Sequence, residues 1–247
     1  MNVAFAVTAR RIAAFAVGIG GVCATARAQY FVQTAQVFPG DATTDYFGWS
    51  IDADGTHMVV GAPKTGTQGQ ALGSAFAYTW QGDAWLPDGS LIDPAPTANS
   101  EFGTVVALSG TTALVANRSG AGSWPRKVEA YRRIGNGAWN SIGQLNIPMV
   151  VDGGEFGAAI AMSKNVIAVG GATMEGRDVV VLYDTADVTT HTAIIEEPQT
   201  AFGVNRKFGW SLALDGDDLL IAARGDDELG TDAGAAYVFH RTSGSSE

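Results

Sequence analysis

Residues 47–63 read FGWSIDADGTHMVVGAP, and this stretch contains the pattern that decides the fold. A Phe-Gly pair opens a short apolar run, a polar turn follows at Asp54-Gly55, and a second apolar run ends at Gly61-Ala62-Pro63. Asp and Gly tolerate the positive φ angles that tight hairpin turns require. The stretch therefore predicts a β-hairpin.

The same pattern returns three more times, at intervals of 55, 54 and 52 residues. The Phe-Gly pairs that stand in phase are Phe47-Gly48, Phe102-Gly103, Phe156-Gly157 and Phe208-Gly209. Each is followed by two apolar runs around a polar turn, such as Ser109-Gly110 in the second repeat and Lys164-Asn165 in the third. Self-similarity at a nearly fixed period indicates a repeat architecture.

Two more strands complete each repeat. A third apolar run follows at residues 74–80, 128–132, 179–183 and 235–240, and a weaker fourth segment is visible at 84–92 and 138–147. Four short strands in about 50 residues match one blade of a β-propeller. Runs such as 219–223 do not alternate, as is typical of strands buried on both faces. We therefore predict an all-β propeller of about four four-stranded blades that begin near residues 47, 102, 156 and 208.

The two ends of the array leave two interpretations open. Tyr30–Phe38 precedes the first Phe-Gly and is similar to the fourth segment of a blade, whereas the last repeat ends after its third run. The N-terminal segment could supply the strand that the last blade lacks, which would close the ring and remove an exposed sheet edge. The alternative is an incomplete propeller that needs further blades or a second chain.

These units resemble FG-GAP repeats, the modules of the integrin α-subunit N-terminal propeller and of many bacterial secreted proteins. The resemblance covers about residues 30–242, although the Gly-Ala-Pro half of the motif is complete only at Gly61-Ala62-Pro63. The well-known propellers of this family have seven blades, so four is a departure. The resemblance implies a binding or adhesion module that recognises a protein or a glycan through loops on a rigid scaffold.

The first 28 residues have the features of a secretory signal peptide. Arg10 and Arg11 precede an apolar stretch of thirteen residues (12–24), and Ala26-Arg27-Ala28 is an A-x-A cleavage pattern. The stretch is too short to span a bilayer as a helix, which needs about 20 residues. We therefore predict a signal peptide at 1–28 and a propeller domain at 29–247. The product is expected to be secreted, extracellular or periplasmic, without membrane insertion after cleavage.

The composition narrows the partners and the metal chemistry. The net charge is −10, from 15 Lys and Arg against 25 Asp and Glu, so nucleic acid is not an expected partner. The single Cys excludes a disulfide within the chain and a Cys-rich zinc site. Apolar residues make up 46% of the chain, which is enough for a substantial core.

A calcium site is the one metal site that the sequence suggests. In related repeats, alternating acidic residues after Gly-Ala-Pro surround a calcium ion with oxygen ligands. The loop at 64–73 contains no acidic residue, but residues 224–232 read RGDDELGTD. The candidate ligands there are Asp226, Asp227, Glu228 and Asp232. They lack the alternating spacing, and the alternative interpretation is a solvated acidic turn.

The sequence indicates no catalytic residue and no organic cofactor site. His57, His191 and His240 stand at different phases of their repeats, and none belongs to a metal-binding pair. Ser50 and Ser211 lie outside a G-x-S-x-G motif. The alternative function is a hydrolase or lyase with its site in the central channel, which would need acidic residues and a His to converge there. A third alternative is a structural fragment of a larger surface protein.

Two short patterns are expected to be structural. Arg224-Gly225-Asp226 spells the tripeptide that integrins bind, and we attribute it to chance because so short a motif arises easily. Trp49, Trp210, Trp85 and Trp139 recur at related repeat positions. We expect them to pack between blades rather than to form a platform for sugars.

Overall fold

The computed structural model describes residues 33, 35–39, 45–66, 71–118, 127–135, 137–148, 155–198 and 206–242. The predicted signal peptide at 1–28 lies outside the described residues. The compact unit considered below begins at Ala35. All regular elements of the described ranges are strands. A helix with the length and hydropathy needed to cross a membrane is absent from this part of the chain.

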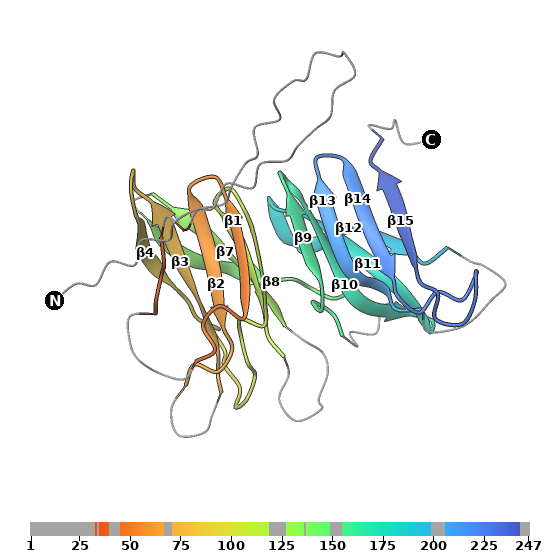
Figure 1. The fold of residues 1–247 in the computed structure, drawn as a ribbon, viewed down its shortest axis with the longest axis horizontal. Helices are drawn as coiled ribbons and strands as arrows, with labels where there is room; N and C mark the ends of the chain where they lie inside the picture. Colours follow the sequence, from red (N-terminus) through yellow and green to blue (C-terminus); the bar gives the residue numbers. More distant parts are fainter. Residues whose placement is uncertain are drawn as a thin grey trace, which may run out of the picture. The chain divides into compact units, whose positions relative to one another are not determined.

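The strands form four antiparallel sheets, each built from consecutive strands (Figure 1). Blade 1 contains β1 (Ser50–Asp54), β2 (His57–Ala62), β3 (Ser74–Trp80) and β4 (Trp85–Leu91). Blade 2 contains β5 (Val105–Ser109), β6 (Thr112–Ala116), β7 (Val128–Ile134) and β8 (Ala138–Gln144). Blade 3 contains β9 (Ile160–Ser163), β10 (Val166–Met174), β11 (Arg177–Asp184) and β12 (Asp187–Glu196). Blade 4 contains β13 (Phe208–Asp215), β14 (Asp218–Ala223) and β15 (Ala235–His240).

The four sheets form a four-bladed β-propeller, which confirms the predicted fold class. The first strands of neighbouring blades are in contact, β1 with β5, β5 with β9, and β9 with β13. Blade 4 has three strands among the described residues. The proposed closing segment, Tyr30–Phe38, lies partly outside those residues, and its described residues, 33 and 35–38, are not assigned to a strand.

Tight turns join the first two strands of every blade, as the sequence predicts. Residues Asp54 and His57 pair across the first turn, with Gly55 at φ 59° between them. Gly110 and Gly216 take the same conformation in blades 2 and 4. In blade 3 the positive φ falls on Lys164 (φ 53°) rather than on its neighbour Asn165. The turn geometry is therefore kept even where the sequence offers no glycine.

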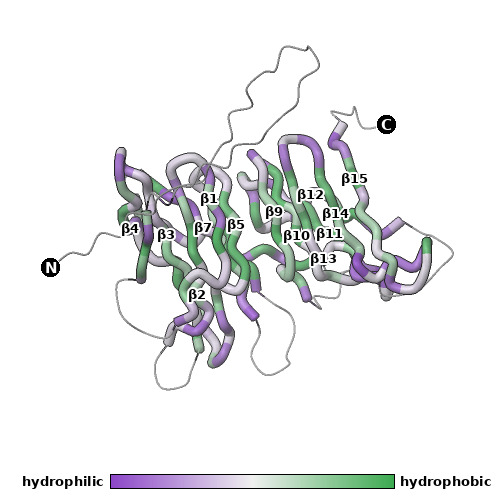
Figure 2. The backbone as a smooth tube through the Cα atoms, viewed as in Figure 1, coloured by the Kyte–Doolittle hydropathy of each residue, from purple (hydrophilic) through white to green (hydrophobic). Residues whose placement is uncertain are grey.

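The Phe-Gly motifs of blades 2, 3 and 4 each join their blade to the blade before it. Phe102 is fully buried in a cluster between blades 1 and 2, and Phe156 lies in the cluster between blades 2 and 3. Phe208 belongs to the cluster between blades 3 and 4. In Figure 2 the apolar residues follow the strands within the sheets, whereas polar residues gather at many of the turns. The core of the molecule therefore lies in the layers between the blades.

Backbone packing between blades explains the glycine of the Gly-Ala-Pro half. A Cβ atom on Gly61 would lie 2.1 Å from the carbonyl oxygen of Gly103 in the next blade. Gly170 stands in the same relation to the carbonyl oxygen of Gly209, again at 2.1 Å. Real side chains do not approach a backbone oxygen so closely, so these two junctions require glycine.

Candidate functional site

The hairpin turns of blades 1, 2 and 3 surround a polar cavity of about 690 Å³. The cavity lies where the turns between the first two strands of these blades come together. Its polar lining combines hydroxyl groups, two carboxylates and one ammonium group. These side chains belong to Asp52, Asp54, Ser109, Thr111, Thr112, Ser163, Lys164 and Thr185.

Both carboxylates in the cavity hold the next blade in place. The Oδ2 atom of Asp52 accepts a hydrogen bond from the backbone N–H of Leu108 at 2.7 Å. The Oδ2 atom of Asp54 accepts one from the N–H of Gly110 at 2.6 Å. At the junction of blades 3 and 4, Ser163 Oγ accepts the N–H of Gly216 at 3.0 Å. The rim of the cavity is therefore fixed by contacts that repeat from blade to blade.

The polar lining of the cavity can form hydrogen bonds with a ligand. A histidine is absent from its lining within the described ranges. His57 contacts the edge of Trp139 at 6.4 Å between ring centres, and exposed His240 lies 2.6 Å from Asp218. The convergence of acidic residues and a His that a channel hydrolase needs is therefore not met at this cavity. Hydroxyl groups and the Lys164 ammonium can instead form hydrogen bonds with a polar ligand.

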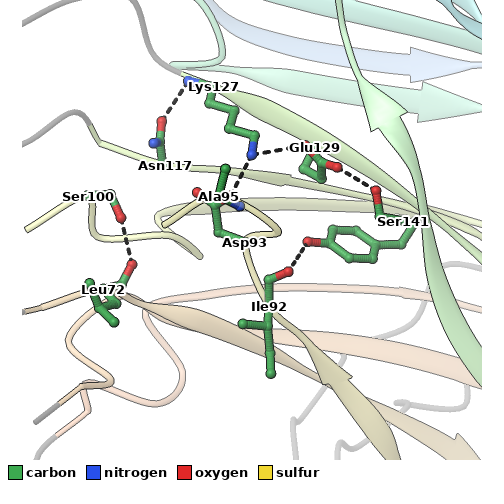
Figure 3. Close-up of polar contacts among 10 residues, drawn as sticks. Leu72, Ile92, Asp93, Ala95, Ser100, Asn117, Lys127, Glu129 and Ser141 are labelled. Atoms are coloured by element: carbon green, nitrogen blue, oxygen red, sulfur yellow. Dashed lines mark hydrogen bonds and ion pairs between the residues drawn. The ribbon is translucent and has the colours of Figure 1, made fainter. Parts of the chain in front are cut away.

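A second polar cluster lies at the junction of blades 1 and 2 (Figure 3). Lys127 Nζ lies 2.5 Å from Asp93 Oδ1 and 3.2 Å from Glu129 Oε2, and all three side chains are largely buried. Burial by itself would lower the pKa of Lys127, but the hydrogen bond and charge of Asp93, together with Glu129, outweigh it and raise that pKa. Ser141 Oγ donates to Glu129 Oε1 at 2.5 Å. The cluster is thus an ion network that joins blades 1 and 2.

A third cluster occupies the junction of blades 3 and 4. Arg206 is almost fully buried, with its Nε 3.4 Å from Glu197 Oε1 and its Nη1 3.3 Å from Asp226 Oδ2. Burial and the hydrogen bond to Asp226 raise the pKa of Tyr237 to about 12. Burial also raises the pKa of Glu197. Like the Lys127 network, this cluster uses its charges to join two blades.

The four candidate calcium ligands do not converge on one point. Asp226 is 1% exposed, and its carboxylate accepts hydrogen bonds from Tyr237 at 2.6 Å and from the N–H of Glu228 at 2.9 Å. Asp227 accepts the N–H of Asp232 at 2.6 Å. Within the described ranges, no group of three or more His, Cys, Asp or Glu residues is placed to hold a metal ion. Calcium binding by this loop stays a prediction.

The integrin-type tripeptide is not displayed as a recognition motif. The guanidinium of Arg224 lies 4.0 Å above the ring of Trp210, while Asp226 is buried two residues later. A motif whose acidic residue is covered cannot present that carboxylate to a partner. The structure therefore agrees with the interpretation that the tripeptide arose by chance.

The prediction that the tryptophans pack between blades is wrong for three of the four. Trp139 packs against the cluster between blades 1 and 2, and Trp85 packs within blade 1 against its outer cluster. Trp49 and Trp210 are 58% and 44% exposed. Trp49 stacks on exposed Tyr46 with the ring planes 10° apart. The recurrence of a residue with the repeat did not predict its burial, because the neighbouring blade differs at each position.

The sequence patterns did not reveal the cavity because its residues come from three separate repeats. One signal was available. Asp54, Ser109 and Ser163 each occupy the last residue of a first strand, so they share one position of the repeat. Polar side chains at the same position of successive blades gather on one face of a propeller.

The family can be assigned from the sequence match. A model of the FG-GAP repeat matches residues 31–78 and 203–239. The chain contains FG-GAP repeats. The two matches fall on the first and last repeats of this FG-GAP protein, and the second and third repeats have the same strand order.

Solved structures offer only a distant likeness. Arabinanase Arb43A from Bacillus subtilis is 9% identical, with 76% of this chain and 69% of that chain covered and a TM-score of 0.41. The N-terminal domain of Nup159 is 12% identical, with coverages of 78% and 55% and a TM-score of 0.41. An endo-arabinanase of family GH43 from Bacillus licheniformis is 11% identical, with coverages of 76% and 69% and a TM-score of 0.40. None of the curated proteins matches this sequence.

Proposed function

We propose that this FG-GAP protein is a non-catalytic binding or adhesion module that acts in the extracellular space or the periplasm. Its ligand is a glycan or a protein that enters the polar cavity at the hairpin turns. The observation that carries the proposal is the lining of that cavity. The threonine hydroxyl groups and one ammonium group remain available to a ligand, while both carboxylates and both serine hydroxyl groups already contact backbone groups of the next blade.

Two further observations support this location and this class of function. FG-GAP repeats occur in extracellular or surface proteins, and the first 28 residues have the composition of a signal peptide. The exposed stack of Tyr46 and Trp49, which is not part of the cavity lining, offers a separate aromatic surface on which the apolar face of a sugar ring can lie. A glycan is therefore the ligand to test first.

The alternatives are less well supported. A hydrolase or lyase in the central channel needs an acid–base pair in the cavity, and the two carboxylates there are used in structural contacts. A purely structural role within a larger surface protein would not require a polar cavity of about 690 Å³. Binding accounts for the cavity without requiring either a missing histidine or a missing domain.

The test is a pair of matched substitutions at lysines with positive φ. Lys164→Gly removes the ammonium from the cavity and keeps the turn, because glycine accepts the φ of 53°. Lys207→Gly is the control, since Lys207 has a φ of 60° and lies outside the cavity. Labelled protein is applied to an array of oligosaccharides, and the best ligand is then titrated by calorimetry. We expect about tenfold weaker binding for Lys164→Gly, because one charged hydrogen bond is lost. The affinity of Lys207→Gly should be unchanged.

Two results would contradict the proposal. Cleavage of a bound oligosaccharide, detected by chromatography after long incubation, would favour the hydrolase alternative. Binding that responds equally to both substitutions would mean that the ligand does not occupy the cavity. If no oligosaccharide binds, the glycan is excluded and the same pair of variants is compared for capture of cell-surface protein.

A further inference from the structure

Three of the four Phe-Gly glycines are pressed against the preceding blade, and one is not. An added Cβ atom would meet a neighbouring blade in blades 2, 3 and 4, but at Gly48 of blade 1 it would meet nothing within 4 Å among the described residues. The nearest neighbours are Ser74 O at 2.2 Å from Gly103, Val128 Cγ2 at 2.6 Å from Gly157, and Val180 Cγ2 at 3.0 Å from Gly209. Blade 1 therefore has an open place where the other blades have a predecessor.

On blade 4, the exposed face is the one that packs on a following blade in blades 1 to 3. Leu220 in β14 is 44% exposed, and Val238, its direct partner in β15, is 70% exposed. The residues at the register position of Leu220 in the other blades are Val59, Leu114 and Ala168, all at 0% exposure. The face that packs on a following blade at three junctions is therefore apolar and open in blade 4.

The polar contacts between blades point the same way. Ser50 Oγ donates to the carbonyl oxygen of Gly103 at 2.9 Å, and Asp54 accepts from Gly110 at 2.6 Å. Ser211 and Asp215 stand at the same two register positions in blade 4, and their side chains have no hydrogen-bond partner among the described residues. Blade 4 thus has the serine and the aspartate that contact the following blade elsewhere, but no following blade contacts them among the described residues.

Blade 1 already has part of a predecessor on its free face. The hydroxyl of Tyr131 donates to the carbonyl of Ile92, at the end of the outermost strand of blade 1, and Tyr183 donates likewise to Asn146 after blade 2, both at 2.7 Å. Tyr78 donates to the carbonyl of Phe38 at 3.1 Å. Residues 35–38 therefore lie where the fourth strand of a preceding blade lies at the other junctions, and β15 is the strand that lacks such a neighbour in the described chain.

The spacing of the outer strands argues against closure by the chain's own two ends. Four blades that close on themselves must turn by about 90° at each junction. With strands about 4.8 Å apart, the fourth strands of neighbouring blades would then lie roughly 20 Å further apart than the first strands, against roughly 11 Å for a turn of about 45°. In the structure the fourth strands touch, β4 with β8 and β8 with β12. Asp88 of β4 accepts hydrogen bonds from Arg133 at 2.7 Å and from Trp139 at 3.1 Å.

From these contacts we infer that a second copy of this chain covers both open faces. Blade 4 of each copy packs on blade 1 of the other, and residues 35–38 of one copy lie beside β15 of its partner. Two such junctions related by a two-fold axis close a ring of about eight blades, with a turn of about 45° at each junction.

The experiment measures the mass of the exported chain in solution by light scattering during size-exclusion chromatography. We expect twice the mass of one chain. Leu220→Asp places a charge on the open face of blade 4, and Ile51→Asp does so on blade 1, where Ile51 is 62% exposed. Each should weaken the dimer by at least about 30-fold, the size of an interface hot spot, and give the mass of one chain.

Leu229→Asp is the matched control, because Leu229 is 92% exposed in the loop before β15, and it should remain a dimer. Circular dichroism is recorded for all variants, and the two blade variants should keep the β spectrum because Leu220 is 44% and Ile51 62% exposed in one chain. A wild-type mass of one chain would overturn the inference in favour of closure by the chain's own ends. A dimer broken by Leu220→Asp and untouched by Ile51→Asp would also overturn it, since the contact would then join two last blades.

Discussion

Strands β6 and β14 occupy the same place in their blades, yet they have different surroundings. Both are apolar runs without alternation, but β6 is buried on both faces whereas every second residue of β14 is open, with the exception of half-buried Ala222. Leu114 and Leu220 stand at one register position and are 0% and 44% exposed. A strand that is apolar on both faces is typical of a sheet that is covered on both sides in the complete assembly. The described residues leave one apolar face of β14 uncovered, and the proposed second copy would cover it.

The largest expected effect separates these two leucines directly. Both substitutions to Ala are made in the Ile51→Asp background, in which the proposed ring cannot form. Leu114→Ala should lower the free energy of unfolding by about 2–5 kcal/mol, because it leaves a cavity between packed blades. Leu220→Ala should cost less than about 1 kcal/mol, since its side chain is half exposed. Urea denaturation followed by tryptophan fluorescence gives both values, and equal losses would break the comparison.

The next test concerns the ion network at the junction of blades 1 and 2. Lys127→Ala leaves the buried carboxylates of Asp93 and Glu129 without their cation, and we expect a loss of about 3 kcal/mol. Lys64→Ala is the control, because Lys64 is 37% exposed in its ion pair with Glu101 and the loss should stay below about 1 kcal/mol. Losses of the same size would mean that the Lys127 network is no more than a surface pair.

A smaller effect is expected from pH at the junction of blades 3 and 4. Burial raises the pKa of Asp178 above its ordinary value of 3.8, so the folded chain binds this proton more tightly than the unfolded chain. Its contribution to stability is therefore largest at low pH and is lost as the pH rises from about 3.8 through the folded pKa.

Asp178→Asn removes that dependence and still offers an oxygen to the N–H of Phe208, which lies 3.2 Å from Asp178. The variant should be at least as stable as the natural chain at pH 7 and should lose the advantage at pH 4. Denaturation at several pH values measures the difference, with Asp232→Asn in an exposed loop as the control. A variant less stable than the natural chain at pH 7 would show that the charge of Asp178 is needed at this junction.

The smallest expected effect is that of calcium on the loop of blade 4. Asp226 is occupied by Tyr237, Arg206 and the backbone of Glu228, so EDTA should change the melting temperature by less than about 1 °C. A rise of several degrees with millimolar calcium would place an ion on Asp227, Glu228 and Asp232 instead. Neutral substitutions of those three residues would then be the next variants to melt with and without calcium.

Local features of the fold could be predicted from the sequence because they depend on short stretches. The turn residues Asp54-Gly55 and Asp215-Gly216 set the hairpins, and the spacing of the Phe-Gly pairs set the blades. The exposed Trp49 and the buried Asp226 could not be predicted in the same way. Their surroundings come from other blades, and neither composition nor spacing specifies which side chain of the next repeat lies opposite.

The candidate site consists almost entirely of contacts between blades, which the sequence patterns could not predict. Its carboxylates, Asp52 and Asp54, are visible in the sequence as turn residues, but their partners Leu108 and Gly110 are a whole repeat away. The pairing of Lys127 with Asp93 likewise joins residues of different blades. A repeat pattern predicts the unit, whereas the site belongs to the interface between units.

Every sheet of this molecule is built from strands that are consecutive in the chain. Strand pairing within a blade therefore closes only short loops, and the entropy lost on closing them is small. Folding can begin in any blade and spread to its neighbours, as in a one-dimensional chain of coupled units. By contrast, the proposed neighbour of β15, residues 35–38, comes from the N-terminal end of a second copy. Docking of that segment on β15 should therefore be the slow, concentration-dependent step of assembly.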